Sequence, residues 1–422
     1  MLSPSFWISR PILECLMCES HELVLRVPLM PMPISTPNFN LSAAQHEEAT
    51  RGVPLDLWQC TNCGHVQVGA IGNPDLQYRD YVYTTSLSPG LPEHFRRYAA
   101  QIVERYALGA GSLVVEIGSN DGTLLSFFKE EGMRVLGVDP ARKIADEATA
   151  RGIPTLADFF SAELASSIAG NYGRADLIVA NNVIANVPSL NDFGSGIAKL
   201  LAPGGVFVFE TQYGPDVIEK TLLDTVYHEH ISYFFAASTC SWLRQHGLEA
   251  IEVEHVATKG GSMRMAAQPR GSNRPITAAV DAWVAAESAK GAFGQAYFAQ
   301  LGIRLGEIRS RLGEVVAAAR ARSREVAGFG VSVGTTALLP QFGLSSELAF
   351  LCDDDPNKAA VLRGPDYTIP VVLPDVLLQR LPFAVVIFAW RYADAIVKKH
   401  AAYLGRGGTF VVPLPEVRVI QS

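Results

Sequence analysis

One short segment of the chain gathers the residue types that move protons. Over residues 224–234 it reads Asp-Thr-Val-Tyr-His-Glu-His-Ile-Ser-Tyr-Phe, so Tyr227, His228, Glu229 and His230 are consecutive. A carboxylate beside an imidazole can orient it and raise its basicity, so the segment favours general acid–base catalysis. Two alternatives remain. The segment could be a structural loop of aromatic and polar residues, or a metal site at His228 and His230, although the helical His-x-x-x-His spacing is absent.

A glycine-containing turn upstream predicts a nucleoside pocket. The sequence Val-Val-Glu-Ile-Gly-Ser-Asn-Asp-Gly over 114–122 leads from an apolar strand into a helix. In open α/β sheets, cofactors bind at the carboxyl ends of such strands. The turn lacks the complete Gly-x-Gly-x-x-Gly pattern, so it does not specifically indicate a pyrophosphate.

The next strand ends in an acidic residue that suits a ribose. Asp139 follows Gly118 by 21 residues, and its carboxylate can accept hydrogen bonds from both ribose hydroxyls. A nucleoside without phosphate is what S-adenosylmethionine offers. A generic doubly wound domain with a glycine in a tight loop is the alternative. The predicted cofactor-binding residues are Glu116, Gly118, Asn120, Asp121, Asp139, Asn181 and Asn182.

Two cysteine pairs near the N-terminus have the spacing of a metal site. They are Cys15-x-x-Cys18 and Cys60-x-x-Cys63, with 41 residues between them. Four thiolates fill a tetrahedral shell and leave no open position for catalysis. Six cysteines in all are too few for a disulfide scaffold. We therefore predict a structural zinc ion, with Gly64 helping to form the turn; four ordinary buried cysteines are the alternative.

A second glycine-rich turn lies in the C-terminal third. Gly328-x-Gly330-x-x-x-Gly334 is followed by three aspartates at 353–355, which alone suggests a dinucleotide such as NAD. The spacing departs from that fingerprint, and Pro340 is expected to break the helix that should follow. We predict a degenerate Rossmann-like domain without a dinucleotide.

The periodicity of apolar residues divides the chain into three predicted domains. Residues 1–88 have little helical period and are predicted to be irregular and loop-dominated. In residues 89–270 strands and helices alternate, which predicts an α/β, doubly wound and mostly parallel sheet with helices on both faces. Residues 271–422 begin with one long or two shorter helices and continue with a smaller βα alternation. The predicted strands are 113–117, 135–138, 177–180, 206–210, 250–256 and 262–267, then 325–329, 348–352, 384–388 and 409–412.

Composition limits the classes of partner. With 48% apolar and 18% charged residues the chain is globular, and its net charge of -7 without a basic block argues against nucleic acid. No apolar stretch approaches the roughly 20 residues of a membrane span, and no signal-peptide pattern is present, so we expect a cytoplasmic protein.

Taken in order, these motifs resemble the sugar C-methyltransferases that act on nucleotide-linked 4-keto-deoxyhexoses. The resemblance covers nearly the whole chain, and the Tyr-His-Glu-His run within it is highly specific. The motifs that carry it are the two cysteine pairs, Asp-Tyr-Val-Tyr at 80–83, Glu-Ile-Gly-Ser-Asn-Asp-Gly-Thr-Leu-Leu at 116–125, Asn-Val at 182–183, Tyr-His-Glu-His at 227–230, Gly-Gly-Ser at 260–262 with Arg264, and Pro-Leu-Pro-Glu-Val-Arg at 413–418.

The resemblance implies a zinc-binding N-terminal domain, a central class I methyltransferase domain that binds S-adenosylmethionine, and a Rossmann-like C-terminal domain that helps to hold the nucleotide sugar. It implies that His230 is the base that removes the proton at C3. Glu229 and Tyr227 would support the 4-keto sugar, and Tyr83 would reach in from the N-terminal domain. A hydrogen on carbon is acidic enough for a neutral histidine only beside a carbonyl, which explains the 4-keto group.

Two departures leave recognition of the nucleotide sugar open. Val-Gly-Thr at 333–335 stands where the family tends to carry Lys-Gly-Asn, and Lys259 stands where a histidine is often found. The alternatives are methylation of oxygen or nitrogen on another acceptor, or a zinc-containing NAD-dependent oxidoreductase or sugar-binding protein. The oligomeric state is open.

Overall fold

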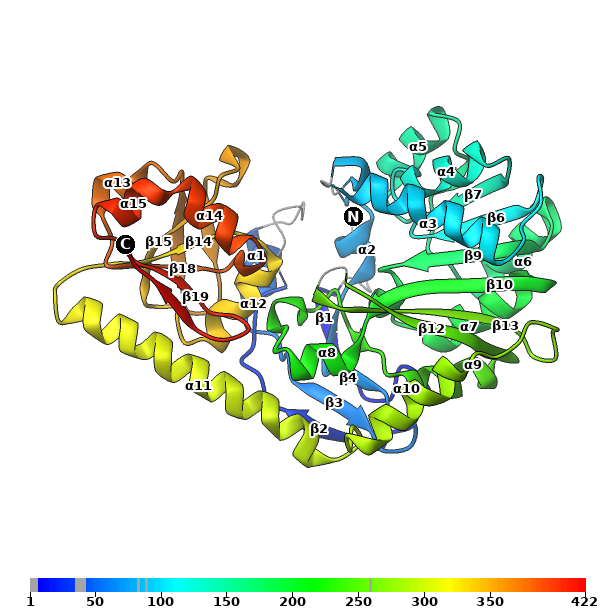
Figure 1. The fold of residues 1–422 in the computed structure, drawn as a ribbon, viewed down its shortest axis with the longest axis horizontal. Coiled ribbons are helices and arrows are strands. Elements are labelled where there is room, and N and C mark those ends of the chain that lie inside the picture. The colour runs from blue at the N-terminus through cyan, green and yellow to red at the C-terminus, as the bar shows by residue number, and fades with distance from the viewer. Residues whose placement is uncertain (1–6, 35–42, 82–83, 88–89, 258–259) are drawn as a thin grey trace.

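The computed structural model describes residues 7–34, 43–81, 84–87, 90–257 and 260–422. Three parts follow one another along the chain (Figure 1). The long helix α11 (Gln295–Arg320) starts near the N-terminal strands and runs below the C-terminal part in this view. Within the described residues, no helix is long and apolar enough to cross a membrane.

The N-terminal part contains more regular structure than its sequence predicted. An antiparallel sheet has the order β11-β4-β3-β2, and β1 pairs with β5. The sequence did not predict these strands, because strands of three to five residues are too short to show a period of two. The elements are β1 (Ser9–Pro11), β2 (Leu23–Val27), α1 (Ala43–Thr50), β3 (Leu57–Cys60), β4 (Val66–Val68), β5 (Ala70–Gly72) and α2 (Pro74–Tyr78).

One strand of this sheet comes from far along the chain. β11 (Ser232–Tyr233) pairs antiparallel with β4, so that Ser232 lies opposite Gln67. The strand begins two residues after His230. The N-terminal sheet therefore holds the end of the Tyr-His-Glu-His segment in place.

The central sheet has the order β12-β13-β10-β9-β6-β7-β8. Its five strands from β10 to β8 are parallel to one another. β13 is antiparallel to β10, and β12, which is antiparallel to β13, runs in the same direction as the five, which confirms the predicted class I methyltransferase sheet. The strands are β6 (Leu113–Ile117), β7 (Arg134–Val138), β8 (Thr155–Leu156), β9 (Ala175–Asn181), β10 (Leu201–Gln212), β12 (Leu248–Val256) and β13 (Ser262–Pro269).

Helices cover both faces of the central sheet, and a separate apolar core lies on each face (Figure 1). Alternate residues of β6 divide between the cores: Val114 packs with Phe95 and Tyr98 of α3, whereas Val115 packs on the opposite face. The sequence missed β8, which has only two residues, and α6. The helices are α3 (Leu91–Arg105), α4 (Thr123–Glu130), α5 (Arg142–Ala150), α6 (Ala162–Tyr172), α7 (Leu190–Leu200), α8 (Gly214–Glu219) and α9 (Ala236–Gln245).

The connector consists of two helices, α10 (Ala278–Ala289) and α11. Leu301, Leu305, Ile308 and Leu312 lie at helical spacing along α11 and are buried in one core with residues from the N-terminal and C-terminal parts. The connector therefore fastens the two outer parts of the molecule to each other.

The C-terminal part is a second sheet with the order β16-β17-β15-β14-β18-β19-β20, in which β17, β15, β14, β18 and β19 are parallel. Chain order reverses between β14 and β18, which makes this a topological switch point. The elements are β14 (Val326–Phe329), α12 (Val333–Gln341), β15 (Leu348–Cys352), β16 (Val361–Arg363), β17 (Thr368–Val372), α13 (Val376–Arg380), β18 (Ala384–Ile387), α14 (Ala393–Lys399), α15 (Ala401–Gly405), β19 (Phe410–Val412) and β20 (Arg418–Ile420).

Pro340 does not break the helix, contrary to the prediction. It lies inside α12, next to the last helical residue, Gln341. The chain bends away from the helix just beyond this point, so the missing N–H of Pro340 removes at most one hydrogen bond from the final turn.

Candidate active site

The carboxyl ends of the central strands open into a cavity of about 1240 Å³. Six of the seven predicted cofactor-binding residues line it, and only Asp121 does not. Gly118 has a φ of 70°, and a Cβ there would come within 2.2 Å of a Val183 methyl carbon. Only glycine therefore allows the backbone turn to lie at the base of this cavity.

Two buried polar side chains on the cavity wall have unsatisfied atoms. Oε2 of Glu116, at the end of β6, and both amide atoms of Asn181, at the end of β9, have no hydrogen-bond partner in the described part of the chain. Burial, together with the charges of Asp139 and Asp121, raises the pKa of Glu116 well above its ordinary value. Buried polar groups normally find partners, so these atoms suit a polar ligand such as the ammonium or hydroxyl groups of the methyl donor.

The next two residues after the turn hold a neighbouring loop. Oδ1 of Asn120 accepts a hydrogen bond from the Thr85 amide at 2.9 Å, and Oδ2 of Asp121 accepts one from the Ser86 amide at 3.0 Å. Burial raises the pKa of Asp121, but hydrogen bonds from Ser86 and Thr123 outweigh it and the net pKa is lowered. Both side chains thus bind the segment that follows Tyr83. Tyr83 itself lies outside the described residues.

Asp139 directly follows β7, as predicted. Its Oδ2 accepts a hydrogen bond from the Asn120 amide at 2.8 Å, and its Oδ1 accepts one from the Ala141 amide at 2.9 Å. These bonds fix the carboxylate at the edge of the cavity.

The sequence missed a third group of cavity residues after β8. Asp158, Phe159 and Phe160 line the cavity, and Arg79 lies 4.5 Å from the Phe159 ring centroid and forms an ion pair of 3.3 Å with Asp158. The sequence contains the run Asp-Phe-Phe, but the strand before it is too short to be predicted, so nothing indicated that this run follows the carboxyl end of a strand at the cofactor pocket. Arg79 comes from the N-terminal part, which therefore closes this end of the cavity.

Two members of the predicted catalytic cluster, Tyr227 and His230, are joined by a hydrogen bond. The hydroxyl of Tyr227 lies 3.0 Å from Nε2 of His230, and the two ring centroids are 4.2 Å apart. Nδ1 of His230 lies 2.9 Å from the Thr225 carbonyl oxygen, which can only accept a hydrogen bond. Nδ1 therefore carries the proton, and Nε2 accepts from Tyr227, whose pKa is raised well above its ordinary value by burial.

Gln212, at the end of β10, also contacts the imidazole. Its side-chain amide group lies 2.7 Å from Nδ1 of His230. Because Nδ1 donates, this contact is satisfied when the amide oxygen of Gln212 faces the ring. The imidazole is thereby held in one tautomer by the Thr225 carbonyl, with its basic nitrogen toward Tyr227.

Glu229 and Tyr78 connect the cluster to the cavity. Tyr78, which lines the cavity, donates a hydrogen bond of 3.4 Å to the Glu229 carbonyl oxygen. The side chains of Tyr227 and Glu229 instead line a second space of about 20 Å³, together with residues of the N-terminal part and of α12. Burial raises the pKa of Glu229 to about 7. The cluster is therefore adjacent to the main cavity without forming its wall.

His228 has a structural contact. It is buried, and its Nε2 donates to the Pro54 carbonyl oxygen at 3.0 Å. Burial lowers the pKa of His228 to about 4, so the ring is neutral at physiological pH. His228 thus ties the cluster to the N-terminal part.

The four cysteines converge, and the group could bind a metal ion. All four Sγ atoms lie within 4.8 Å of one another, with Cys15 and Cys63 3.6 Å apart and Cys18 and Cys60 3.7 Å apart. A tetrahedral zinc ion with Zn–S bonds of about 2.3 Å requires S–S separations of about 3.8 Å. Gly64 has a φ of 81° and its amide donates to the Cys60 carbonyl oxygen, as the predicted turn requires.

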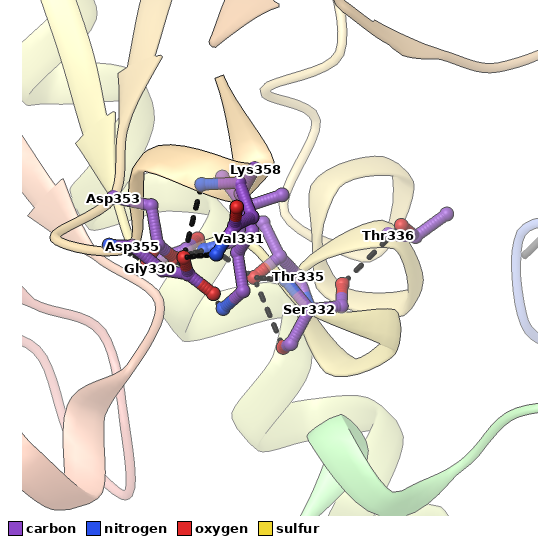
Figure 2. A network of polar contacts seen from close by, with 9 residues as sticks. Gly330, Val331, Ser332, Thr335, Thr336, Asp353, Asp355 and Lys358 are labelled. Atoms are coloured by element: carbon purple, nitrogen blue, oxygen red, sulfur yellow. Dashed lines mark hydrogen bonds and ion pairs between the residues drawn. The ribbon is translucent and has the colours of Figure 1, made fainter. Parts of the chain in front are cut away.

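The C-terminal glycine-rich turn is filled by the protein's own side chains (Figure 2). The Val331 amide donates to Oδ2 of Asp353 at 2.7 Å, and Lys358 forms an ion pair with the same oxygen at 3.1 Å. Ser332 and Thr335 form a capping box at the start of α12. Of the amides that would bind a phosphate in a dinucleotide fold, those of Val331, Ser332 and Thr335 are therefore already used.

Comparison with known proteins agrees with this arrangement. Residues 92–253 match the model of a methyltransferase domain, and residues 257–415 match that of a C-methyltransferase C-terminal domain. The chain is 32% identical to the C-methyltransferase NovU of Streptomyces niveus over 416 residues, which is 98% of each chain. It is 25% identical over 164 residues to a ubiquinone biosynthesis O-methyltransferase of Aromatoleum aromaticum, covering 36% of this chain and 70% of that one.

Two solved structures illustrate the structural matches. A S-adenosylmethionine-dependent methyltransferase from Clostridium acetobutylicum matches with 12% identity and a TM-score of 0.34, over 42% of this chain and 92% of that one. A magnesium protoporphyrin IX methyltransferase from Synechocystis matches with 17% identity and a TM-score of 0.32, over 42% and 79%. On its family matches and its full-length relative, the chain belongs to the S-adenosylmethionine-dependent C-methyltransferases.

Proposed function

We propose that the chain methylates C3 of a nucleotide-activated 4-keto-deoxyhexose. The observation that carries the proposal is the Tyr227–His230 contact, in which a neutral imidazole presents its basic nitrogen to a phenol. A base of this kind suits removal of a proton next to a ketone, which is the step that only methylation of carbon requires. The full-length C-methyltransferase relative supports carbon as the acceptor.

The residues of the cluster divide the chemistry between them. When the sugar binds, the Tyr227 hydroxyl turns to the 4-keto oxygen and leaves Nε2 of His230 free to take the C3 proton. Tyr227 then stabilises the enolate oxygen as negative charge develops there, and Glu229 supports the sugar. S-adenosylmethionine would supply an electrophilic methyl group. The enolate carbon would bond to this methyl group in line as its bond to sulfur breaks, and S-adenosylhomocysteine would leave. Tyr83 is proposed to reach the sugar from the N-terminal part.

The remaining assignments concern binding and scaffolding. Glu116, Gly118, Asn120, Asp139, Asn181 and Asn182 are proposed to bind the methyl donor, with Asp121 acting through the neighbouring loop. The four cysteines are proposed to hold a structural zinc ion, which would tie β3 to the start of the chain. Domain boundaries at residues 88 and 270 are part of the same proposal.

The test follows the C3 proton as well as the methyl group. Purified protein is incubated with labelled S-adenosylmethionine and a panel of nucleotide-linked 4-keto-6-deoxyhexoses, and proton exchange at C3 is measured separately in D₂O. His230→Ala should lower turnover and exchange at least 100-fold, whereas the exposed control His21→Ala should change neither. Turnover of His230→Ala within a few-fold of wild type would rule out this residue as the base. Methyl transfer without any C3 exchange would point to an oxygen or nitrogen acceptor.

A further inference from the structure

The large cavity is lined by carboxylates and contains one strongly basic side chain. Among its described lining residues Arg10 is the single lysine or arginine, in a chain of net charge -7. An anionic ligand that entered here would therefore meet attraction at one place only. The acidic lining residues are Asp75, Glu116, Asp139, Asp158, Asp192 and Glu210.

Arg10 is exposed but held in place by its surroundings. It lies in β1 opposite Ile71 of β5, and its guanidinium carbon is 5.0 Å from the centroid of the Trp7 ring. The carbonyl of Trp7 accepts a hydrogen bond of 2.8 Å from the buried side chain of Asn73. A guanidinium stacked on a fixed ring loses less freedom when it binds a phosphate.

The guanidinium of Arg10 has no competing partner in the described part of the chain. No hydrogen bond or ion pair joins it to another described residue, whereas Arg79, Arg264 and Arg391 all pair with carboxylates. Its donors therefore remain available to a ligand.

The same strand pair places Arg10 near the reaction centre. β5 leads directly into Asn73 and helix α2, whose last residue, Tyr78, contacts Glu229. Trp7, Asn73 and Tyr78 all line the cavity with Arg10. A ligand whose reactive part reached Tyr78 could thus extend its other end toward Arg10.

One aromatic side chain reaches the same cavity from the C-terminal part. Within the described part of the chain, Tyr392 is the single lining residue beyond Glu210, and it is 70% exposed. It lies in the short turn Trp390–Tyr392 (η6), which follows β18 at the switch point of the C-terminal sheet. An exposed ring at the place where such sheets bind ligands is suited to stacking on a planar base.

The glycine-rich turn after β14 is less suited than Arg10 to bind the phosphates of a nucleotide. Its Val331 amide is bonded to Oδ2 of Asp353, and Lys358 pairs with the same oxygen (Figure 2). A diphosphate placed there would have to displace the Asp353 carboxylate from both of these partners.

From these contacts we propose that Arg10, held on Trp7, binds the diphosphate of a nucleoside diphosphate, and that Tyr392 stacks on its base. This inference rests on the proposed function, because it assigns the nucleotide end of the same acceptor. The C-terminal part would then recognise the base through Tyr392 rather than the phosphates through its glycine-rich turn.

Direct binding to the full-length protein tests the assignment without turnover. The titrants are UDP and dTDP, the matching nucleosides without phosphate, and S-adenosylhomocysteine. Loss of a charge-assisted hydrogen-bonded pair should weaken binding of both diphosphates about 10-fold to 100-fold in Arg10→Ala. Affinity for S-adenosylhomocysteine should stay unchanged in that variant. Tyr392→Ala should weaken binding of diphosphates and nucleosides alike.

The matched control is Arg322→Ala, because Arg322 also lies over a ring, 5.2 Å from the Phe383 centroid, but does not line the cavity. It should bind diphosphates as wild type does. The proposal is overturned if wild-type protein binds neither diphosphate, or if Arg10→Ala binds them as tightly as wild type. If Arg10→Ala loses diphosphate affinity while no 4-keto sugar is methylated, the anion site stands and the proposed acceptor fails.

Discussion

At the scale of single residues, the hydroxyl of Tyr227 contacts the basic nitrogen of His230, the proposed base. The basic nitrogen of His230 already has a hydrogen-bond donor in the absence of sugar, so the phenol must be part of the reaction or an obstacle to it. Its raised pKa keeps the phenol protonated and able to donate to an enolate oxygen. The contact thus gives Tyr227 a role that its sequence neighbours do not share.

Replacing Tyr227 by phenylalanine separates these possibilities. Loss of an enolate-stabilising donor should lower kcat by about 100-fold, while KM for S-adenosylmethionine stays within two-fold, as measured by steady-state kinetics. Tyr367→Phe is the matched control, because its hydroxyl is also buried, lies in the C-terminal part and has no hydrogen-bond partner among the described residues. A Tyr227→Phe enzyme with unchanged or higher kcat would show that the phenol only blocks the base.

Glu229 is expected to reduce stability at neutral and higher pH. Burial raises its pKa from 4.5 to about 7, so folding takes up a proton between these values and the buried carboxylate destabilises the folded state as pH rises. Glu229→Gln should therefore raise the free energy of unfolding by about 2 to 3 kcal/mol at pH 8, and by less than about 1 kcal/mol at pH 5.

Urea unfolding at the two pH values measures this difference. The exposed Glu104→Gln serves as the control and should show no pH-dependent gain. An equal effect of Glu229→Gln at both pH values would contradict the assignment of a raised pKa to this carboxyl.

At the scale of elements, the turn between β6 and α4 brings the backbone close to the cofactor position. Gly118→Ala forces a Cβ against Val183 and a side chain into positive φ, so affinity for S-adenosylhomocysteine should fall at least 10-fold. Gly152→Ala is a control for the backbone cost alone, since its φ is 86° but its Cβ would meet only the Lys129 side chain at 3.4 Å. Calorimetric titration of both variants with S-adenosylhomocysteine should separate the effect of the clash with Val183 from the effect of a side chain at positive φ. Comparable affinity in the two variants would argue against a close approach at Gly118.

The pairing of β11 with β4 explains why the N-terminal part matters for catalysis. The Ile231 amide donates to the Ala185 carbonyl, and the Ile231 carbonyl accepts from the Val68 amide, directly after His230. His230 is thus held between the central and N-terminal sheets. Its position depends on elements that are more than 100 residues apart in sequence.

At the scale of the whole molecule, the cysteine cluster should stabilise the arrangement that holds the base. Removing the metal with a chelator should lower the melting temperature and reduce kcat, because β3 and β4 support β11. Affinity for S-adenosylhomocysteine should change much less. Cys60→Ser should reproduce the loss, whereas Cys240→Ala, a buried cysteine outside the cluster, should keep its metal content. Elemental analysis that found no bound metal in active wild-type protein would overturn the zinc assignment.

The sequence by itself determined the central sheet, the two turns and the cluster around His230. These features depend on local patterns: apolar runs long enough to show a period, and reactive residues that are neighbours in the chain. The same reasoning failed where elements were short, as in β8 and the N-terminal sheet. It also failed at Pro340, because α12 continues through this residue and ends at the next one, Gln341.

Only the tertiary structure decided which distant residues share the cavity. Arg10, Asp158 and Tyr392 come from three separate parts of the chain, and no local pattern relates them. Their meeting is set by strand pairing and by the connector helices, which are long-range contacts. Likewise, Tyr227 and His230 are neighbours in the sequence, but the fold determines the tautomer, since the Thr225 carbonyl fixes which nitrogen of His230 is basic.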